Sequence, residues 1–206
     1  MDKEMTTKEK IIFESLRLFS KEGYDGVSMR EIASAVGIKG ASLYNHFSGK
    51  DEIFNAIFDT MKMHYDNTAV SMNIPMEEND KTVETYLNID EDGLFKMAEG
   101  LLYFFCKDEF TVMFRKLLVS EQHKYPLAAK LLKQYYIDAP ILFQTQLFSG
   151  FQKKGSMKDY DANMMALHFY SPIYYILSKN DLGVSYEECL QTVRSHVHGF
   201  CLLYTK

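Results

Sequence analysis

The chain has 206 residues, of which 47% are hydrophobic and 25% are charged. These fractions are close to those of ordinary globular proteins, which argues against a disordered or low-complexity chain. Lys and Arg number 23 against 28 Asp and Glu. The formal net charge of -5 excludes a protein coated with positive charge, although it leaves room for a local basic patch.

The hydrophobic residues recur mostly at spacings of three and four, and the chain holds only 4 Pro and 11 Gly. This periodicity is typical of amphipathic helices, and the alternating pattern of strands is hard to find, so we predict an all-α fold. The first helix is announced by Thr6-x-x-Glu9, the pattern of a capping box, and Gly23 is placed to end it.

Two short helices follow in the sequence pattern. Ser28-x-x-Glu31 is a second capping-box pattern, and it predicts a helix that ends at Gly37. A third helix is predicted over about residues 39–47, and a fourth, longer helix begins near Lys50.

The rest of the chain is also predicted to be helical. Residues 71–91 contain a proline and an acidic, polar run, which suits a connection between two lobes. Further helices are expected near residues 91–107, 109–123, 126–153, 161–178 and 186–204. We expect an N-terminal helix-turn-helix domain over residues 1–50 and a helical domain over residues 51–206.

Prolines and one more capping pattern add detail to these helices. Pro126 suits the first position of a helix, whereas Pro140 and Pro172 fall inside helical patterns and should kink or break them. Ser185-x-x-Glu188 is a third capping-box pattern, and it opens the last predicted helix.

The segment that carries function most directly lies between Ser28 and Lys50. Two short amphipathic helices joined by a turn with a glycine make a helix-turn-helix, at about residues 28–47, whose second helix can enter the major groove of DNA. Residues 27–50 have a local excess of two positive charges, and Lys39 and Lys50 bracket the third helix, where they can reach phosphates. The alternative is a helical hairpin packed in a core, with its charges merely solvated.

The sequence G-I-K-G-A-S-L-Y-N-H-F-x-x-K, from Gly37 to Lys50, strongly resembles the recognition-helix signature of the tetracycline-repressor (TetR) family of bacterial transcription regulators. The resemblance covers about residues 7–60. It implies a three-helix DNA-binding head, a helical body that binds an effector, and a homodimer. The candidate DNA contacts combine the positions that it implies with Gly40, whose small size lets the backbone approach base edges: Ser28, Arg30, Lys39, Gly40, Ser42, Tyr44, His46 and Lys50.

Direct reading of bases by the recognition helix is expected to be sparse. Gly40 and Ala41 offer no side-chain hydrogen bonds, and Lys39 is the only full charge on this helix. Specificity should therefore rest on Ser42, Arg30 and the shape of the DNA.

Aromatic and methionine side chains crowd the predicted body. A hydrophobic core explains most of them, but tyrosines prefer to keep their hydroxyl partnered, and this many suits a pocket with an amphipathic wall. With the resemblance to a ligand-sensing family, we expect a pocket for a small hydrophobic effector. Its candidate lining residues are Met61, Leu101, Phe104, Phe105, Met113, Phe114, Tyr135, Phe143, Tyr170 and Tyr174.

The last two predicted helices carry apolar stripes at spacings of three and four. Such stripes can pair into four-helix bundles across a twofold axis, so we expect them to form the interface of a homodimer. The candidates are Phe169, Ile173, Leu177, Leu190, Val193, Val197, Cys201 and Tyr204.

Catalytic and metal-binding signatures are missing from the sequence. It has no nucleophile elbow, nucleotide-binding loop, zinc-protease motif or dinucleotide fingerprint, so we expect no enzyme, no metal and no cofactor. The three cysteines form no CxxC pair, which favours a reducing cytoplasm over a disulfide framework. No stretch of about 20 predominantly apolar residues could cross a membrane.

These features predict a ligand-responsive transcription regulator of the cytoplasm. Its partners would be a double-stranded DNA operator, a second copy of the chain and a small hydrophobic effector, and it would most simply be a repressor that the effector releases. The alternative is a helical ligand-binding or protein-interaction module whose DNA-binding head is not functional, and the acidic net charge favours that alternative.

Overall fold

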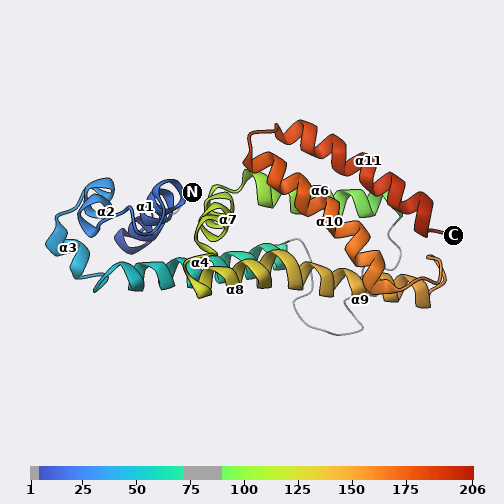
Figure 1. Ribbon diagram of the computed structural model, residues 1–206, viewed down its shortest axis with the longest axis horizontal. Coiled ribbons are helices and arrows are strands. Elements are labelled where there is room, and N and C mark those ends of the chain that lie inside the picture. The colour runs from blue at the N-terminus through green and yellow to red at the C-terminus, as the bar shows by residue number, and fades with distance from the viewer. Residues whose placement is uncertain (1–4, 72–89) are drawn as a thin grey trace. The chain divides into compact units, whose positions relative to one another are not determined.

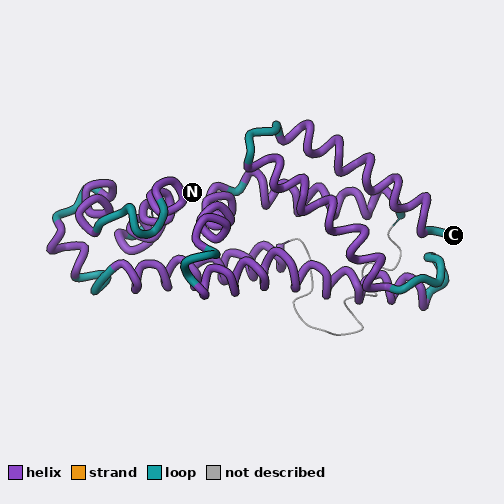
Figure 2. The backbone as a smooth tube through the Cα atoms, in the orientation of Figure 1, coloured by secondary structure: helices purple, strands orange, loops and turns teal. Residues whose placement is uncertain are grey.

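The computed structural model describes residues 5–71 and 90–206, and the side chains of all of these except 69–71. The predicted all-α fold is confirmed, and within the described residues the only extended pairing is an isolated bridge between Met157 and Thr205 (Figures 1 and 2). The helices in chain order are α1 (Thr7–Glu22), α2 (Met29–Val36), α3 (Gly40–Tyr44), α4 (Lys50–Ser71), α6 (Glu91–Lys107), α7 (Glu109–Glu121), α8 (Pro126–Lys133), the π-helical segment η1 (Gln134–Asp138), α9 (Ala139–Lys153), α10 (Ala162–Asp181) and α11 (Tyr186–Tyr204).

The capping patterns begin their helices where the sequence predicts. Glu9 and Thr6 cap each other at the start of α1, and the same reciprocal pair forms at the start of α2. At α11 only half of the pattern is present: the Ser185 hydroxyl accepts the Glu188 N–H at 3.2 Å, while the Glu188 carboxylate lies 3.4 Å from Lys179.

The prolines differ in their effect. Pro126 begins α8, as expected. Pro140 does not break its helix: the chain stays helical from Pro126 to Lys153 and passes through the π-helical segment η1 just before the proline, which sits in the first turn of α9. Pro172 does not end its helix, since α10 runs through it to Asp181. The connection predicted over residues 71–91 lies almost wholly outside the described residues.

The chain forms two compact units, and the first comprises Met1–Thr68 and Glu109–Lys130. Within this unit α1 packs against α2 and α7. The core is a run of aromatic rings with centroids 4.7 to 5.8 Å apart from one ring to the next, which consists of Phe19, Tyr24, Phe54, Phe58 and Phe114. These rings join α1 and the turn after it to α4 and α7.

The second unit comprises Ala69–Asp108 and Leu131–Lys206. Here α10 packs between α9 and α11, and α11 also packs against α6. The rings of Phe148, Phe169 and Phe200 meet at centroid distances of 4.9 to 5.5 Å and join the three long helices. In the described residues no helix is both long and apolar enough to cross a membrane.

Candidate nucleic-acid interface

The helix-turn-helix is built from local signals. The inner face of α2 buries Ile32 and Ala33, and the helix ends at Gly37, whose φ of 77° is left-handed and suits glycine. Helix α3 is shorter than the predicted 39–47, because regular helix ends at Tyr44. The N–H groups of His46 and Phe47 still bond to the carbonyl of Leu43, which closes a final tight turn.

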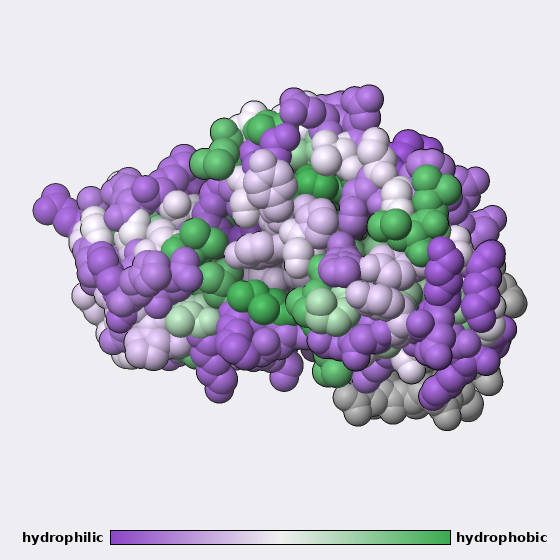
Figure 3. All heavy atoms as spheres, turned by 45° about the vertical axis from the view of Figure 1, so that its right-hand side comes forward, coloured by the Kyte–Doolittle hydropathy of each residue, from purple (hydrophilic) through white to green (hydrophobic). Residues whose placement is uncertain are grey.

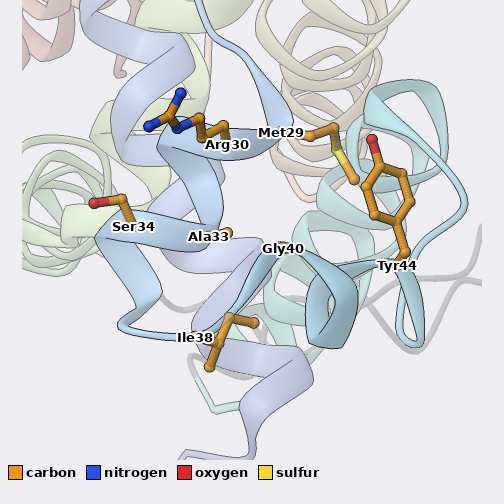
Figure 4. A pocket seen from close by; sticks show the side chains of 7 residues that line it. All are labelled: Met29, Arg30, Ala33, Ser34, Ile38, Gly40 and Tyr44. Atoms are coloured by element: carbon orange, nitrogen blue, oxygen red, sulfur yellow. The ribbon is translucent and has the colours of Figure 1, made fainter.

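A hollow of about 370 Å³ lies between α2 and α3. Figure 4 shows Met29 and Tyr44 lying toward one another on one side, with Ile38 on another side and Arg30 pointing away. Three of the predicted DNA contacts line this hollow, together with four residues that the sequence did not single out. The complete lining is Met29, Arg30, Ala33, Ser34, Ile38, Gly40 and Tyr44.

Two cations on this face are free of ion pairs within the described residues. Arg30 and Lys39 are both exposed, one on α2 and the other at the start of α3. Tyr44 is more than half exposed and His46 is exposed, whereas Ser42 is half-buried. Unpaired exposed cations next to a helix-turn-helix are what phosphate contacts require.

Ser28 is engaged within its own helix start. Its hydroxyl donates to the Glu31 carboxylate at 2.6 Å, and its backbone N–H donates to the same oxygen at 2.7 Å. These bonds lower the pKa of Glu31 below its usual range. The Glu31 carboxylate therefore already accepts both hydrogen bonds that Ser28 could donate to a phosphate at this helix start.

Lys50 also has a partner inside the protein. Its ammonium group donates to the backbone carbonyl of Tyr24 at 2.7 Å and lies 4.5 Å from the centre of the Tyr24 ring. The Tyr24 hydroxyl donates to Asp51 at 2.5 Å, and burial together with this bond raises the pKa of Tyr24. The start of α4 thus holds the turn between α1 and α2.

Helix α7 holds the same turn from another direction, a feature that the sequence did not reveal. The buried carboxylate of Glu121 accepts the Tyr24 N–H at 3.2 Å. Tyr125 donates to Asp25 at 2.5 Å, which raises the pKa of Tyr125 to about 12 and lowers that of Asp25. These partners lie about 100 positions apart, so no local pattern could have found them.

The predicted effector-pocket residues divide between the two units. Met61, Met113 and Phe114 are buried in the first unit, and the remaining candidates belong to the second. Phe105 and Tyr170 are brought together there around Tyr136, with the Tyr170 hydroxyl donating to the Tyr136 carbonyl at 2.9 Å. The fully buried Tyr136 was not among the candidate lining residues that the sequence analysis selected. The other candidates in this unit are Leu101, Phe104, Tyr135, Phe143 and Tyr174.

The residues predicted to form a dimer interface pack inside the protomer. All are buried except Leu190, which is half-buried: Phe169, Ile173, Leu177, Val193, Val197, Cys201 and Tyr204. Other hydrophobic residues of α10 and α11 are exposed instead, namely Met164, Leu167, Tyr175, Leu202 and Leu203. The face of the molecule in Figure 3 shows hydrophobic clusters interspersed among hydrophilic residues.

A group of three metal-ligating side chains is not found among the described residues.

Comparison with known proteins identifies the N-terminal arrangement. Residues 11–57, which hold most of α1, the helix-turn-helix and the first turns of α4, match the family described as bacterial regulatory proteins, tetR family. The N-terminal head of this chain is therefore similar to that of the tetR family of regulators. Over 72 residues it is 40% identical to IcaR of Staphylococcus epidermidis, the negative transcriptional regulator of the biofilm operon icaADBC. That match covers 31% of this chain and 39% of IcaR, so the chain spans well under two thirds of the curated relatives that it matches.

Solved structures share the fold over nearly the whole chain. A protein from Mesorhizobium loti MAFF303099, assigned to the TetR family of transcriptional regulators, has a TM-score of 0.70 at 20% identity, covering 97% of both chains. SmeT of Stenotrophomonas maltophilia, in complex with triclosan, has a TM-score of 0.68 at 13% identity, covering 98% of this chain and 93% of SmeT. The family description and the name of IcaR both denote transcription regulators.

Proposed function

We propose that this protein is a TetR-family repressor that binds an operator as a homodimer and is released by a small hydrophobic molecule. The single observation that carries the DNA-binding part is the family match over residues 11–57, placed on a head whose exposed face presents Arg30 and Lys39 without ion-pair partners. In bacteria such a regulator would act in the cytoplasm, where the operator lies.

On the operator, Arg30 and Lys39 would contact phosphates or base edges from the two helices of the helix-turn-helix. Ser42, Tyr44 and His46 would contribute hydrogen bonds from the recognition helix and its end. Lys50 has three N–H donors, and one bonds to Tyr24, so two remain for a phosphate. Contact with DNA and support of the turn are therefore compatible roles for Lys50.

Ser28 would reach a phosphate only after exchanging its bond to Glu31.

The functional division that we propose keeps DNA reading in residues 1–50 and effector binding and dimerisation in residues 51–206. Compact packing divides the chain differently, because α4 and α7 serve as the scaffold of the head. Helix α7, which lies outside the proposed DNA-reading residues, therefore packs directly against the DNA-reading head.

Dimerisation would use the exposed side chains of α10 and α11. Met164, Leu167, Tyr175, Leu202 and Leu203 are large hydrophobic residues that a monomer leaves in water, so a second copy would gain free energy by covering them. Two heads held across a twofold axis would contact two half-sites, which one protomer cannot do.

The effector and the sign of regulation are proposed from relatives. IcaR is named as a negative regulator, which supports repression. SmeT is solved with triclosan, a small apolar molecule, which supports a ligand site in a body of this fold. In this chain, the aromatic cluster of Phe105, Tyr136 and Tyr170 is our candidate for one wall of that site.

The experiment is to incubate the purified protein with fragmented DNA of its own genome, recover what it retains and sequence it. Recovered fragments are then titrated at several salt concentrations with wild type, Arg30→Ala and Lys39→Ala. Lys154→Ala, which removes an exposed charge from the second unit, is the matched control. We expect a few enriched sites, weaker binding by both head variants, and a salt slope reduced by about one unit for each lost phosphate contact. Retention without preference, unchanged in all variants, would favour the alternative of a non-functional head.

A further inference from the structure

The hollow between α2 and α3 has an apolar floor. Met29 and Ile38 are half-buried in it and Ala33 is buried, whereas Arg30, Ser34 and Tyr44 are exposed. Figure 4 shows Ala33 and Gly40 between the Met29–Tyr44 side and Ile38. The side chains of Met29, Ile38 and Ala33 carry only carbon and a thioether sulfur, so they offer no hydrogen-bond donor and no nitrogen or oxygen acceptor to whatever enters.

Gly40 keeps this hollow open, although the protein itself does not need a glycine there. A Cβ at this position would meet nothing within 4 Å, and its φ lies outside the left-handed region. Glycine weakens a helix relative to alanine, so a glycine that packing does not require is costly to keep. The free space at Gly40 is therefore best explained by a close approach of something outside the chain.

The position of the hollow identifies what approaches. Arg30 and Tyr44 stand at its rim, and Lys39 immediately precedes Gly40, so a duplex held by these residues passes over its mouth. Base edges in the major groove carry nitrogen and oxygen donors and acceptors, with one apolar exception, the C5 methyl group of thymine. An apolar floor at this place favours that methyl group over every other group on the edges.

We propose that the hollow receives the edge of one A·T pair in each half-site, with the thymine C5 methyl on the floor made by Met29, Ala33 and Ile38. Met29 and Ile38 are then specificity-determining residues, which read thymine without a hydrogen bond. The inference rests on the proposed binding of an operator by the head. The hollow is larger than one methyl group, which fits the entry of a base-pair edge with some water beside it.

The test uses the operator recovered from the genome and synthetic duplexes in which each thymine of a half-site is replaced, one at a time, by deoxyuridine. This change removes only the methyl group. Affinities are measured with wild type, Met29→Ala, Ile38→Ala and the control Val36→Ala. Val36 is a half-buried residue at the end of α2 that does not line the hollow. Thermal unfolding shows which variants keep the fold.

We expect one thymine per half-site at which deoxyuridine weakens wild-type binding about fourfold, the effect of losing the burial of one methyl group. The loss should disappear in Ile38→Ala or Met29→Ala and persist in Val36→Ala. Tight operator binding with no thymine-sensitive position, or with a sensitivity that both floor variants retain, would overturn this inference while leaving DNA binding intact. Failure to recover any operator would instead contradict the proposed function.

Discussion

A carboxylate oxygen of Glu121 accepts the backbone N–H of Tyr24 at 3.2 Å, across 97 positions of sequence. Glu121 is only 3% exposed, and a Cβ added at Gly23 would come within 2.9 Å of the same oxygen. The other carboxylate oxygen has no hydrogen-bond partner among the described residues. The end of α7 is therefore fitted closely against the turn that leads into the helix-turn-helix.

Replacing Glu121 should loosen this turn. Glu121→Ala leaves the buried Tyr24 N–H without an acceptor, which costs about 1–3 kcal/mol of unfolding free energy. Glu121→Gln keeps an oxygen at the same place and should cost clearly less. Urea unfolding of both variants measures the difference, and equal stability of both with wild type would show that the bond contributes nothing.

Lys50→Ala should lower the stability of the protein as well as its operator affinity. The ammonium group loses its bond to the Tyr24 carbonyl and its position over the Tyr24 ring, together worth about 1–2 kcal/mol. Lys62→Ala removes an exposed lysine from the same helix and is the control, with no change in unfolding expected. If Lys50→Ala weakens DNA binding at unchanged stability, Lys50 acts on phosphate alone.

Gly40→Ala should raise the stability of the protein while it weakens operator binding. The new methyl group meets no atom, and a less flexible unfolded chain raises the free energy of unfolding by about 0.4–1 kcal/mol. The same methyl group should obstruct the duplex and weaken operator binding. Gly37→Ala is the contrasting control: its space is equally open, but its left-handed φ of 77° makes alanine cost about 1 kcal/mol or more. Calorimetry and gel shift measure the two effects, and tighter operator binding by Gly40→Ala would refute the close approach.

Charged substitutions should distinguish the core of the second unit from its exposed hydrophobic residues. Val193 is 0% exposed, so Val193→Glu buries an unpaired charge and should unfold this unit. Leu203 is 65% exposed, so Leu203→Glu should fold normally but give a monomer. Circular dichroism and light scattering report folding and mass. A Leu203→Glu dimer as stable as wild type would place the interface elsewhere.

A small hydrophobic compound that raises the melting temperature should also weaken the operator complex. The ligand must favour one conformation, and typical couplings change the DNA affinity by about 5- to 150-fold. Linkage requires the operator to weaken ligand binding by the same factor. Calorimetric titration of the compound with and without operator checks this directly, and identical affinities would rule out effector-controlled release.

Features that depend on near neighbours in sequence could be predicted well. The starts of α1 and α2 are set by a hydroxyl and a carboxylate three positions apart, and the end of α2 by a single glycine, so the short patterns located them correctly. The helix-turn-helix could be located for the same reason.

Features that depend on partners far apart in the sequence could not be predicted from it. The sequence suggested that Lys50 faces a phosphate, but its Tyr24 partner lies 26 positions away. The apolar stripe that includes Val193 and Val197 predicted a dimer interface, whereas both side chains are buried within the protomer. An apolar stripe does not reveal whether it packs against the same chain or against another copy. The hollow beside Gly40 likewise depends on how α2 and α3 are spaced, which no side-chain pattern specifies.

The most direct measurement of the central claim is a nuclease footprint of the protein on a fragment recovered from its genome, at protein concentrations around the dissociation constant. A dimer with two helix-turn-helix heads should protect two half-sites whose centres lie about 10 base pairs apart, or a multiple of this spacing, on one face of the duplex. Arg30→Ala and Lys39→Ala should lose this protection at concentrations where Lys154→Ala retains it. Absence of a protected segment, or protection unchanged in the two head variants, would contradict the claim that this head reads operator DNA.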